Sequence, residues 1–439
     1  KRKLSAFLLN GNTGQDGMSW QDMEKFGGGD MNFEMSDEGG MMFFSGGRGS
    51  SDGEPYINPQ NGFITNTNAG VQYNNKWGKN SLNFSPKFNS QVWDNNRTNY
   101  LRTVSNDSIF NQNSQTATHI NRYNFKTKGT LDLNIDSNNS LKLTLNANIY
   151  YTESEEQTQS VTTGDAGNFK NASDINQQNK SDKQSFGGSL LYKHKFKKDR
   201  RTLSINADLG KLDSDAGNFL QQQFSDNQSG VVTDINQFKD ISNSTSNVAT
   251  KLVYTEPLTK KFSLEIGHEL SYSKGKNNQQ TYNFTPATGK FDDRVDTLSN
   301  NFDQQIVTNK PYAKIAYSSK KIKYNLGMGV GYTHFNLDDI SYNKTYVRDF
   351  TNIFPSAFLT YSYKSNHSLR FNYNGRTTQP TLNQLQPLRN NNNPYNQYIG
   401  NPDLKQSFSN SINLSHNGYD FLTDRWMYQS LNFNMTSNA

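Results

Sequence analysis

The chain has 439 residues, 32% of them hydrophobic and 19% charged, with a formal net charge of +6 and no cysteine. The lack of cysteine excludes a disulfide framework, a thiolate metal site and a cysteine nucleophile. No apolar run approaches the roughly 18 residues of a membrane-spanning helix, so an α-helical membrane protein is also excluded.

Alternating apolar and polar residues are the dominant pattern along the chain, and they predict β-strands. A first strand is predicted at residues 2–12, and the pattern is clearest at 123–151. There, Tyr123 to Ile135 and Leu141 to Tyr151 form two alternating runs around a polar turn, which predicts a hairpin. The same pattern recurs at 71–92, 186–209, 248–270, 313–332, 357–373 and 408–433. In all, about fifteen strands of about 11–14 residues are predicted.

The predicted connections are of two kinds. Turns within a hairpin take about three to six residues, whereas the stretches between hairpins take about 18 to 50 and are predicted to be loops. Outer-membrane barrels have short periplasmic turns and long extracellular loops. The fold class predicted is therefore all-β, a transmembrane antiparallel β-barrel; the alternative is a secreted soluble β-protein, which detergent dependence would distinguish.

Aromatic residues on the apolar phase of the strands gather at two levels. One level lies near the short turns and the other near the predicted long loops, as expected for rings at the two membrane interfaces. The simpler alternative is β-propensity, which enriches Tyr in any strand. The first level contains Trp77, Tyr192, Tyr254, Phe262, Tyr317, Tyr324 and Trp426, and the second Tyr123, Tyr151, Tyr272 and Tyr332.

The first and last predicted strands both run outward. Because a closed bacterial barrel has an even number of strands, residues 1–439 are expected to form a single incomplete barrel domain. An odd number of strands would follow Ala439 and an even number would precede Lys1, so this polypeptide would not close a barrel by itself. The chain also begins in mid-pattern without a signal peptide, as expected for a mature or internal piece.

Residues 353–404 carry the most recognisable motifs. An Arg-x-x-x-Pro loop is followed by a Gly-Asn-Pro-x-Leu element, and the whole segment resembles the barrel of TonB-dependent outer-membrane receptors. The Asn-rich strands and the Gly/Met-rich loop after residue 17 are similar to the outer-membrane β-barrel family of Bacteroidetes. The motif residues, to which a structural role is assigned, are Phe354, Pro355, Ser356, Arg376, Pro380, Gly400, Asn401, Pro402 and Leu404.

This resemblance implies uptake of a ligand across the bacterial outer membrane, driven by the TonB complex, through a barrel with a plug domain. Neither plug nor coupling box is in this sequence. If the barrel resembles the 22-stranded transporters with a plugged lumen, about seven strands are absent. Expected partners are outer-membrane lipid, the TonB complex and a surface lipoprotein or other outer-membrane subunits. The alternative is a non-transporting accessory subunit, and the ligand-binding residues are not identified.

Catalytic and metal sites find little support, so neither enzyme activity nor a cofactor is expected. His334 with Asp338 and Asp339 is the one hint of an acid–histidine cluster, and a solvated loop is preferred there because no nucleophile accompanies it. Asp213-x-Asp215 lacks the Gly and Glu of a calcium-binding EF-hand loop. Basic turns such as 197–201 are too short and separated to bind nucleic acid, and they are expected to meet lipid phosphates or periplasmic partners.

The Met-rich segment offers another possible metal site. Its thioethers suit Cu(I), but its glycines favour a mobile loop in which Met supplies adaptable contacts. Its methionines are Met18, Met23, Met31, Met35, Met41 and Met42.

Overall fold

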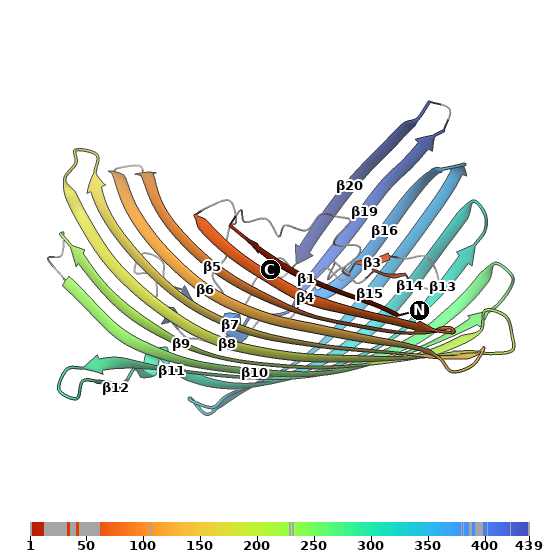
Figure 1. The fold of residues 1–439 in the computed structure, drawn as a ribbon, viewed down its shortest axis with the longest axis horizontal. Helices are drawn as coiled ribbons and strands as arrows, with labels where there is room; N and C mark the ends of the chain where they lie inside the picture. Colours follow the sequence, from red (N-terminus) through yellow and green to blue (C-terminus); the bar gives the residue numbers. More distant parts are fainter. Residues whose placement is uncertain are drawn as a thin grey trace.

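One antiparallel sheet dominates the computed structural model, curved into an open trough (Figure 1). Fifteen of its strands follow one another in chain order, and β12 pairs with β11 off this path. The structure describes residues 2–12, 33–35, 41–43, 62–105, 108–227, 230, 232–378, 380, 382–385, 389–390, 398–401, 403–421 and 423–437. No helix in these ranges is long and apolar enough to cross a membrane.

The strands of the path are β1 (Arg2–Gly11), β4 (Phe63–Trp77), β5 (Asn80–Ser105), β6 (Ser108–Asn134), β7 (Asn139–Gly164), β8 (Phe169–Lys195), β9 (Thr202–Asp226), β10 (Val232–Pro257), β11 (Phe262–Thr285), β13 (Asn300–Ser318), β14 (Ile322–Asp339), β15 (Lys344–Lys364), β16 (His367–Thr378), β19 (Ser407–Asp420) and β20 (Arg425–Ser437). The short elements are β12 (Lys290–Arg294), a 3₁₀ helix η1 (Asp296–Leu298), α2 (Leu382–Leu385) and the strand pairs β2 (Phe33–Met35) with β3 (Met41–Phe43) and β17 (Arg389–Asn390) with β18 (Tyr398–Ile399).

The predicted all-β fold and its strand number are confirmed. In the β6–β7 hairpin, Leu131 pairs with Leu143, and Leu143 pairs in turn with Leu190 of β8. The apolar phase therefore continues from strand to strand on one face of the sheet. Leu145 and Leu326 on this face are 54% and 55% exposed, because the protein itself does not cover it. A broad apolar band that faces outward is what lipid contact requires.

The predicted long loops are wrong for β5 to β11. These strands have 24 to 27 residues, and the segments predicted to be loops are their outer halves. In those halves both faces carry Ser, Thr, Asn and Gln, so hydropathy stops alternating although the hydrogen-bonded ladder continues. Cross-strand polar pairs stabilise such a ladder, for example Thr116 and Thr158, whose hydroxyls are 3.1 Å apart.

Two aromatic levels are present on the lipid-facing phase. Near the short turns, the Tyr317 ring lies 4.8 Å from Phe262 and 5.3 Å from Tyr324. At the other level, Tyr123 stacks with Tyr151 at 6.1 Å. The ten residues that separate the levels in β11 correspond to about 25 Å of membrane thickness for a tilted strand, the height of the apolar band in known barrels. The outer halves of the long strands therefore lie beyond the membrane.

One residue predicted to belong to the aromatic level near the short turns does not lie on the lipid-facing phase. Trp426 pairs with Tyr419, whereas the lipid-facing phase of the same strands runs through the pair Leu414–Leu431. Trp426 thus lies on the opposite phase, where its indole donates a hydrogen bond to Asn417 at 3.2 Å. The sequence misled because the apolar residues of β20 change phase between Tyr428 and Leu431, although the pairing with β19 continues without a shift.

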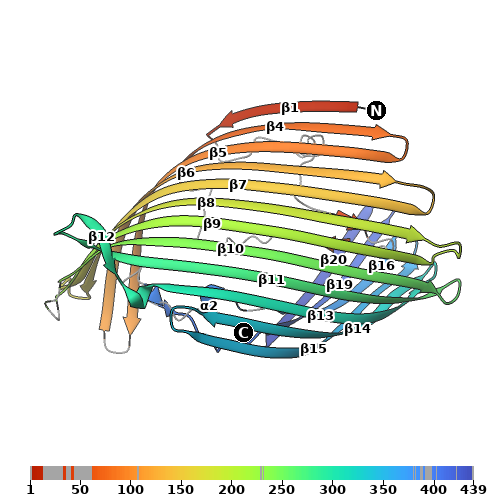
Figure 2. The ribbon, with the colours of Figure 1, turned by 90° about the horizontal axis from the view of Figure 1, so that it is seen from below.

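The sheet has two edges, β1 and β20, which lie at opposite ends of the strand order (Figures 1 and 2). No pairing joins these two strands in the ranges described above. The single incomplete barrel domain at residues 1–439 stays a prediction.

Candidate functional site

The phase opposite to the lipid-facing one forms the lumen wall, and one stretch of it is strongly basic. Residues of β1 and of β4 to β8 line a cavity of about 950 Å³ in this wall. Asn, Ser and Thr make up most of the rest of its lining. Its ionisable residues are Lys3, Lys76, Lys87, Lys126, Lys128 and one carboxylate, Asp132.

Two of these lysines face each other directly. Lys87 of β5 and Lys126 of β6 are paired in register, and Lys126 is followed across the sheet by Asn148 of β7. Neither lysine forms an ion pair with any residue that the structure describes. Like charges directly opposite one another destabilise a sheet, so this pair is a local cost that an anion in the cavity would relieve.

Buried amide oxygens accompany the lysines. Gln72 is only 7% exposed. Its Oε1, like Oδ1 of Asn148, is buried and has no hydrogen-bond partner in the described part of the chain. A buried acceptor without a partner is costly, and both residues line the cavity. The cavity therefore offers cationic donors together with acceptors that need a donor.

The wall of β10 to β13 is different, because its charges neutralise one another. Glu269 lies between Lys251, whose Nζ is 2.9 Å from Oε1, and Lys310, whose Nζ is 2.5 Å from Oε2. Four residues nearer the short turns, Lys314 Nζ is 3.2 Å from Glu265 Oε1. This half of the wall presents paired charges to the lumen, in contrast to the basic cavity.

Glycines let aromatic rings lie flat on this wall. The Tyr312 ring crosses Gly267, and a Cβ at Gly267 would overlap the ring. Phe354, a predicted motif residue, lies in the same way over Gly331, where a Cβ would come 2.5 Å from the Phe354 ring. Lys310 Nζ is 5.2 Å from the Phe354 ring centroid. The Phe354 ring is thus packed on the inner wall.

The segment between β16 and β19 is anchored to the outer part of the lumen wall. Leu385 of α2 is fully buried in a cluster with Phe302, Phe335 and Leu337, which project from the lumen phase of β13 and β14. Because α2 contributes only four residues, this apolar contact rather than helix propensity holds it.

The Gly-Asn-Pro-x-Leu element joins the same anchor. The backbone N–H of Asn401 donates to Gln384 O at 2.7 Å, and the Asn401 side chain accepts from the Asp403 N–H at 2.8 Å. From the wall, Arg348 donates to Leu404 O. The Asn is suited to this position because its side chain can stabilise a turn of its own backbone.

The other motif residues lie at separate places in the fold. Pro355 and Ser356 lie in β15, and Arg376 is exposed in β16, paired with Ser409. Pro380 and Gly400 are described without belonging to an element, and Pro402 lies outside the described residues. The structural role assigned to the motif residues stays a prediction.

His334 does not lie in the solvated loop that the sequence analysis preferred. It lies in β14, and its Nδ1 is 2.8 Å from Asp349 of β15. Tyr332 donates to the same carboxylate at 2.7 Å. Asp339 is buried on the opposite phase.

Metal ligation has no candidate in the described ranges, which contain no group of three His, Cys, Asp or Glu residues able to hold a metal. In the Met-rich segment, Met35 lies in β2 and Met41 and Met42 lie in β3, whereas Met18, Met23 and Met31 lie outside these ranges. Asp213 is part of β9, where it accepts a hydrogen bond from Ser244 and pairs with Lys211.

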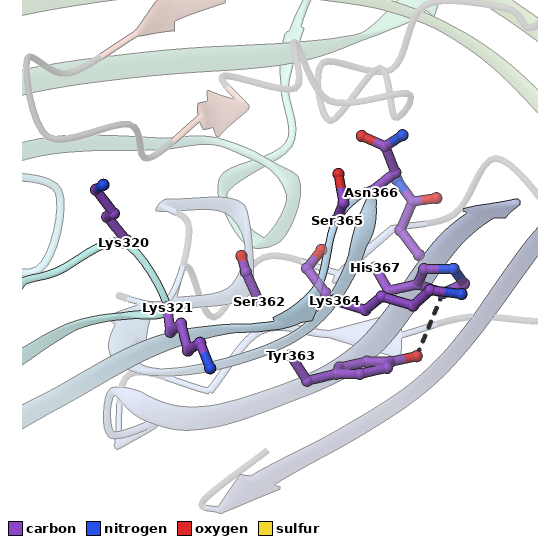
Figure 3. Close-up of a pocket in the computed structure, with 10 residues that line it drawn as sticks. Lys320, Lys321, Ser362, Tyr363, Lys364, Ser365, Asn366 and His367 are labelled. Carbon is purple, nitrogen blue, oxygen red and sulfur yellow. Dashed lines mark hydrogen bonds between the residues drawn. The ribbon is translucent and has the colours of Figure 1, made fainter. Parts of the chain in front are cut away.

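A second, smaller cavity lies at the short-turn rim. It has a volume of about 520 Å³, and Lys320, Lys321 and Lys364 surround its entrance (Figure 3). The Tyr363 hydroxyl is 3.4 Å from His367 Nδ1 and 2.8 Å from His416 Nε2. A basic rim next to the aromatic level is suited to contact with lipid phosphates.

Another ion cluster joins two short turns of this rim, outside the membrane. Glu256 accepts hydrogen bonds from Arg201, Lys198 and the Tyr254 hydroxyl. These donors, Arg201 above all, lower the pKa of the Glu256 carboxyl from 4.5 to about 2.

The solved structures that match this chain include an autotransporter domain and a siderophore receptor. The translocator domain of autotransporter NalP from Neisseria meningitidis is 10% identical, with a TM-score of 0.26 over 69% of this chain and 83% of that one. The siderophore receptor PiuA from Acinetobacter baumannii is 8% identical, with a TM-score of 0.27 over 85% and 78%. TM-scores this low carry no argument about this chain.

A comparison with curated proteins gives no match. The model of the outer membrane protein beta-barrel family matches residues 194–439, more than half of the chain. That match agrees with the apolar band, the two aromatic levels and the polar lumen wall. The chain belongs to the outer membrane protein beta-barrel family and is a protein of the bacterial outer membrane.

Proposed function

We propose that this chain is the barrel of a TonB-dependent receptor that takes up a polar solute across the outer membrane. The observation that carries the proposal is the polar lumen wall with its 950 Å³ cavity of lysines and amides. A barrel that served only as a scaffold would have no need of a cavity lined by five lysines and one carboxylate at a depth where the opposite face meets hydrocarbon. The resemblance of residues 353–404 to such receptors supports the same function.

The energy source is part of the proposal. Transport against a gradient through a plugged lumen needs work from the inner membrane, and the TonB complex is the partner that the resemblance implies.

Uptake by intact cells tests the proposal. Native cells with and without the gene would be incubated with an isotope-labelled mixture of solutes too large for porins, and the accumulated solutes identified by mass spectrometry. We expect at least one solute to accumulate only when the gene is present, and a protonophore to abolish this accumulation. If no solute differs and the protein co-purifies with other outer-membrane subunits, the accessory-subunit alternative replaces this proposal.

A further inference from the structure

The basic cavity in the lumen wall indicates which class of solute it holds. Within the described residues, five lysines and a single carboxylate line the cavity of β1 and β4 to β8. Elsewhere on the wall, Glu269 is paired with Lys251 and Lys310, and Glu265 is paired with Lys314. The cavity of β1 and β4 to β8 therefore carries an excess of positive charge, which attracts anions to it.

Lys87 and Lys126 supply the strongest local attraction. They are opposite each other in β5 and β6, and no described carboxylate pairs with either. An anionic group between two ammonium groups would form charge-assisted hydrogen bonds with both. It would at the same time remove the repulsion of the pair.

An anionic charge alone does not satisfy all the polar groups that line the cavity. Gln72 Oε1 and Asn148 Oδ1 are acceptors without partners, and an anion offers them nothing. Hydroxyl groups next to the anionic groups would donate to these oxygens. A solute that carries both kinds of group meets the donors and the acceptors of the wall together.

We propose that this cavity binds a hydroxylated anion, a solute that carries carboxylate or phosphate groups next to hydroxyl groups. The inference rests on the proposed uptake function, and it names the class of solute taken up. A volume of about 950 Å³ accommodates a solute of several sugar-sized units.

Calorimetric binding to the full chain, purified in detergent at low salt, tests the class. Four probes separate the features: trigalacturonate and fructose 1,6-bisphosphate carry anionic and hydroxyl groups, maltotriose only hydroxyl groups, and tricarballylate only carboxylates. We expect one of the first two to bind at least about tenfold more tightly than the last two. Which of the two binds better distinguishes carboxylate from phosphate. Equal affinities, or no binding of either hydroxylated anion, would overturn the proposal.

Substitutions of the cavity lysines test whether the anionic probe binds in the cavity. Lys87→Gln combined with Lys126→Gln should weaken the preferred anionic probe about tenfold or more. Lys323→Gln, on the lumen phase of β14 and outside the cavity, is the matched control and should change nothing. Heat-modifiable migration of each variant verifies folding; if the double variant does not fold, Lys126→Gln alone takes its place. Unchanged affinity in the folded variant would contradict the proposal.

The binding experiment and the uptake experiment can fail independently of each other. Binding of the anions without uptake would keep the solute class and remove the transport function. Uptake of other solutes without anion binding would do the reverse.

Discussion

Arg201 donates two hydrogen bonds to Glu256, from Nε at 2.7 Å and from Nη2 at 2.8 Å, and so ties the β8–β9 turn to the end of β10. The pKa of Glu256, lowered from 4.5 to about 2, means that the folded state favours the ionised carboxylate. The pair therefore stabilises the barrel fully above pH 4.5, and its contribution is lost as the pH falls towards 2.

The first prediction follows from this linkage. Glu256→Gln should flatten the acid sensitivity of the barrel between pH 4.5 and 2, because the substituted side chain does not titrate. Unfolding in urea, followed at several pH values by heat-modifiable migration, measures it. Arg201→Gln should flatten the same interval, since it removes the main cause of the lowered pKa. An unchanged pH profile in both variants would mean that the pair contributes no stability.

A second prediction concerns the ring that crosses Gly267. Gly267→Ala should lower the free energy of unfolding by about 1–3 kcal/mol, because the new methyl group overlaps the Tyr312 ring and forces it from the wall. Gly275→Ala is the control on the same face of β11, where the nearest atom would be 3.6 Å from the new Cβ. Equilibrium unfolding of both variants measures the difference. Equal stabilities would show that the ring moves aside without cost.

The membrane-level hairpins could be predicted from the sequence and the outer halves of the strands could not, for a physical reason. At Leu141 to Tyr151 one face meets hydrocarbon and the other the lumen, so the residues alternate. Beyond Tyr151, both faces meet water or polar side chains, and Ser160, buried against Ser173, is as suitable there as an apolar residue. Periodicity reports a difference between two faces, and it vanishes where the faces are alike.

The candidate site shows the same limit. The motif containing Asn401 was recognisable, but its anchor, Arg348, carries no local signal because it lies more than fifty residues earlier in the chain. Lys87 and Lys126 are likewise ordinary alternating lysines until the strand register places them opposite one another. The register of a strand pair depends on residues far apart in the chain, so it cannot be predicted from either strand's sequence alone.

A third prediction tests the anchored segment. Leu385→Ala should destabilise the packing of α2 on β13 and β14 by about 2–5 kcal/mol, because Leu385 is fully buried and leaves a cavity. Hydrogen exchange of the Asn401 amide, which is bonded to Gln384 O, measures the loss. Leu404→Ala is the control, since that side chain is 36% exposed. Equally fast exchange in both variants would show that Leu385 does not hold the segment.

A fourth prediction compares two adjacent residues of β7. Leu145→Arg should cost about 2–4 kcal/mol, because it places a charge on the lipid-facing phase near the bilayer midplane. Thr144→Arg, one residue away on the lumen phase, should be tolerated. Folding into lipid bilayers under urea titration measures both. Similar costs would contradict the assignment of the two phases.

The most direct test of the membrane account is a spin-label scan of β7, which is straightforward because the chain has no cysteine of its own. Single cysteines at each position from Leu141 to Gln159 would be labelled in the protein reconstituted in lipid bilayers, and their access to oxygen and to a polar nickel reagent compared. We predict oxygen contact at every second position up to Tyr151, on the phase of Leu143 and Leu145, and polar access on both faces beyond it. Polar access on both faces throughout, or lipid contact that extends far past Tyr151, would contradict a barrel that crosses the membrane with its inner strand halves alone.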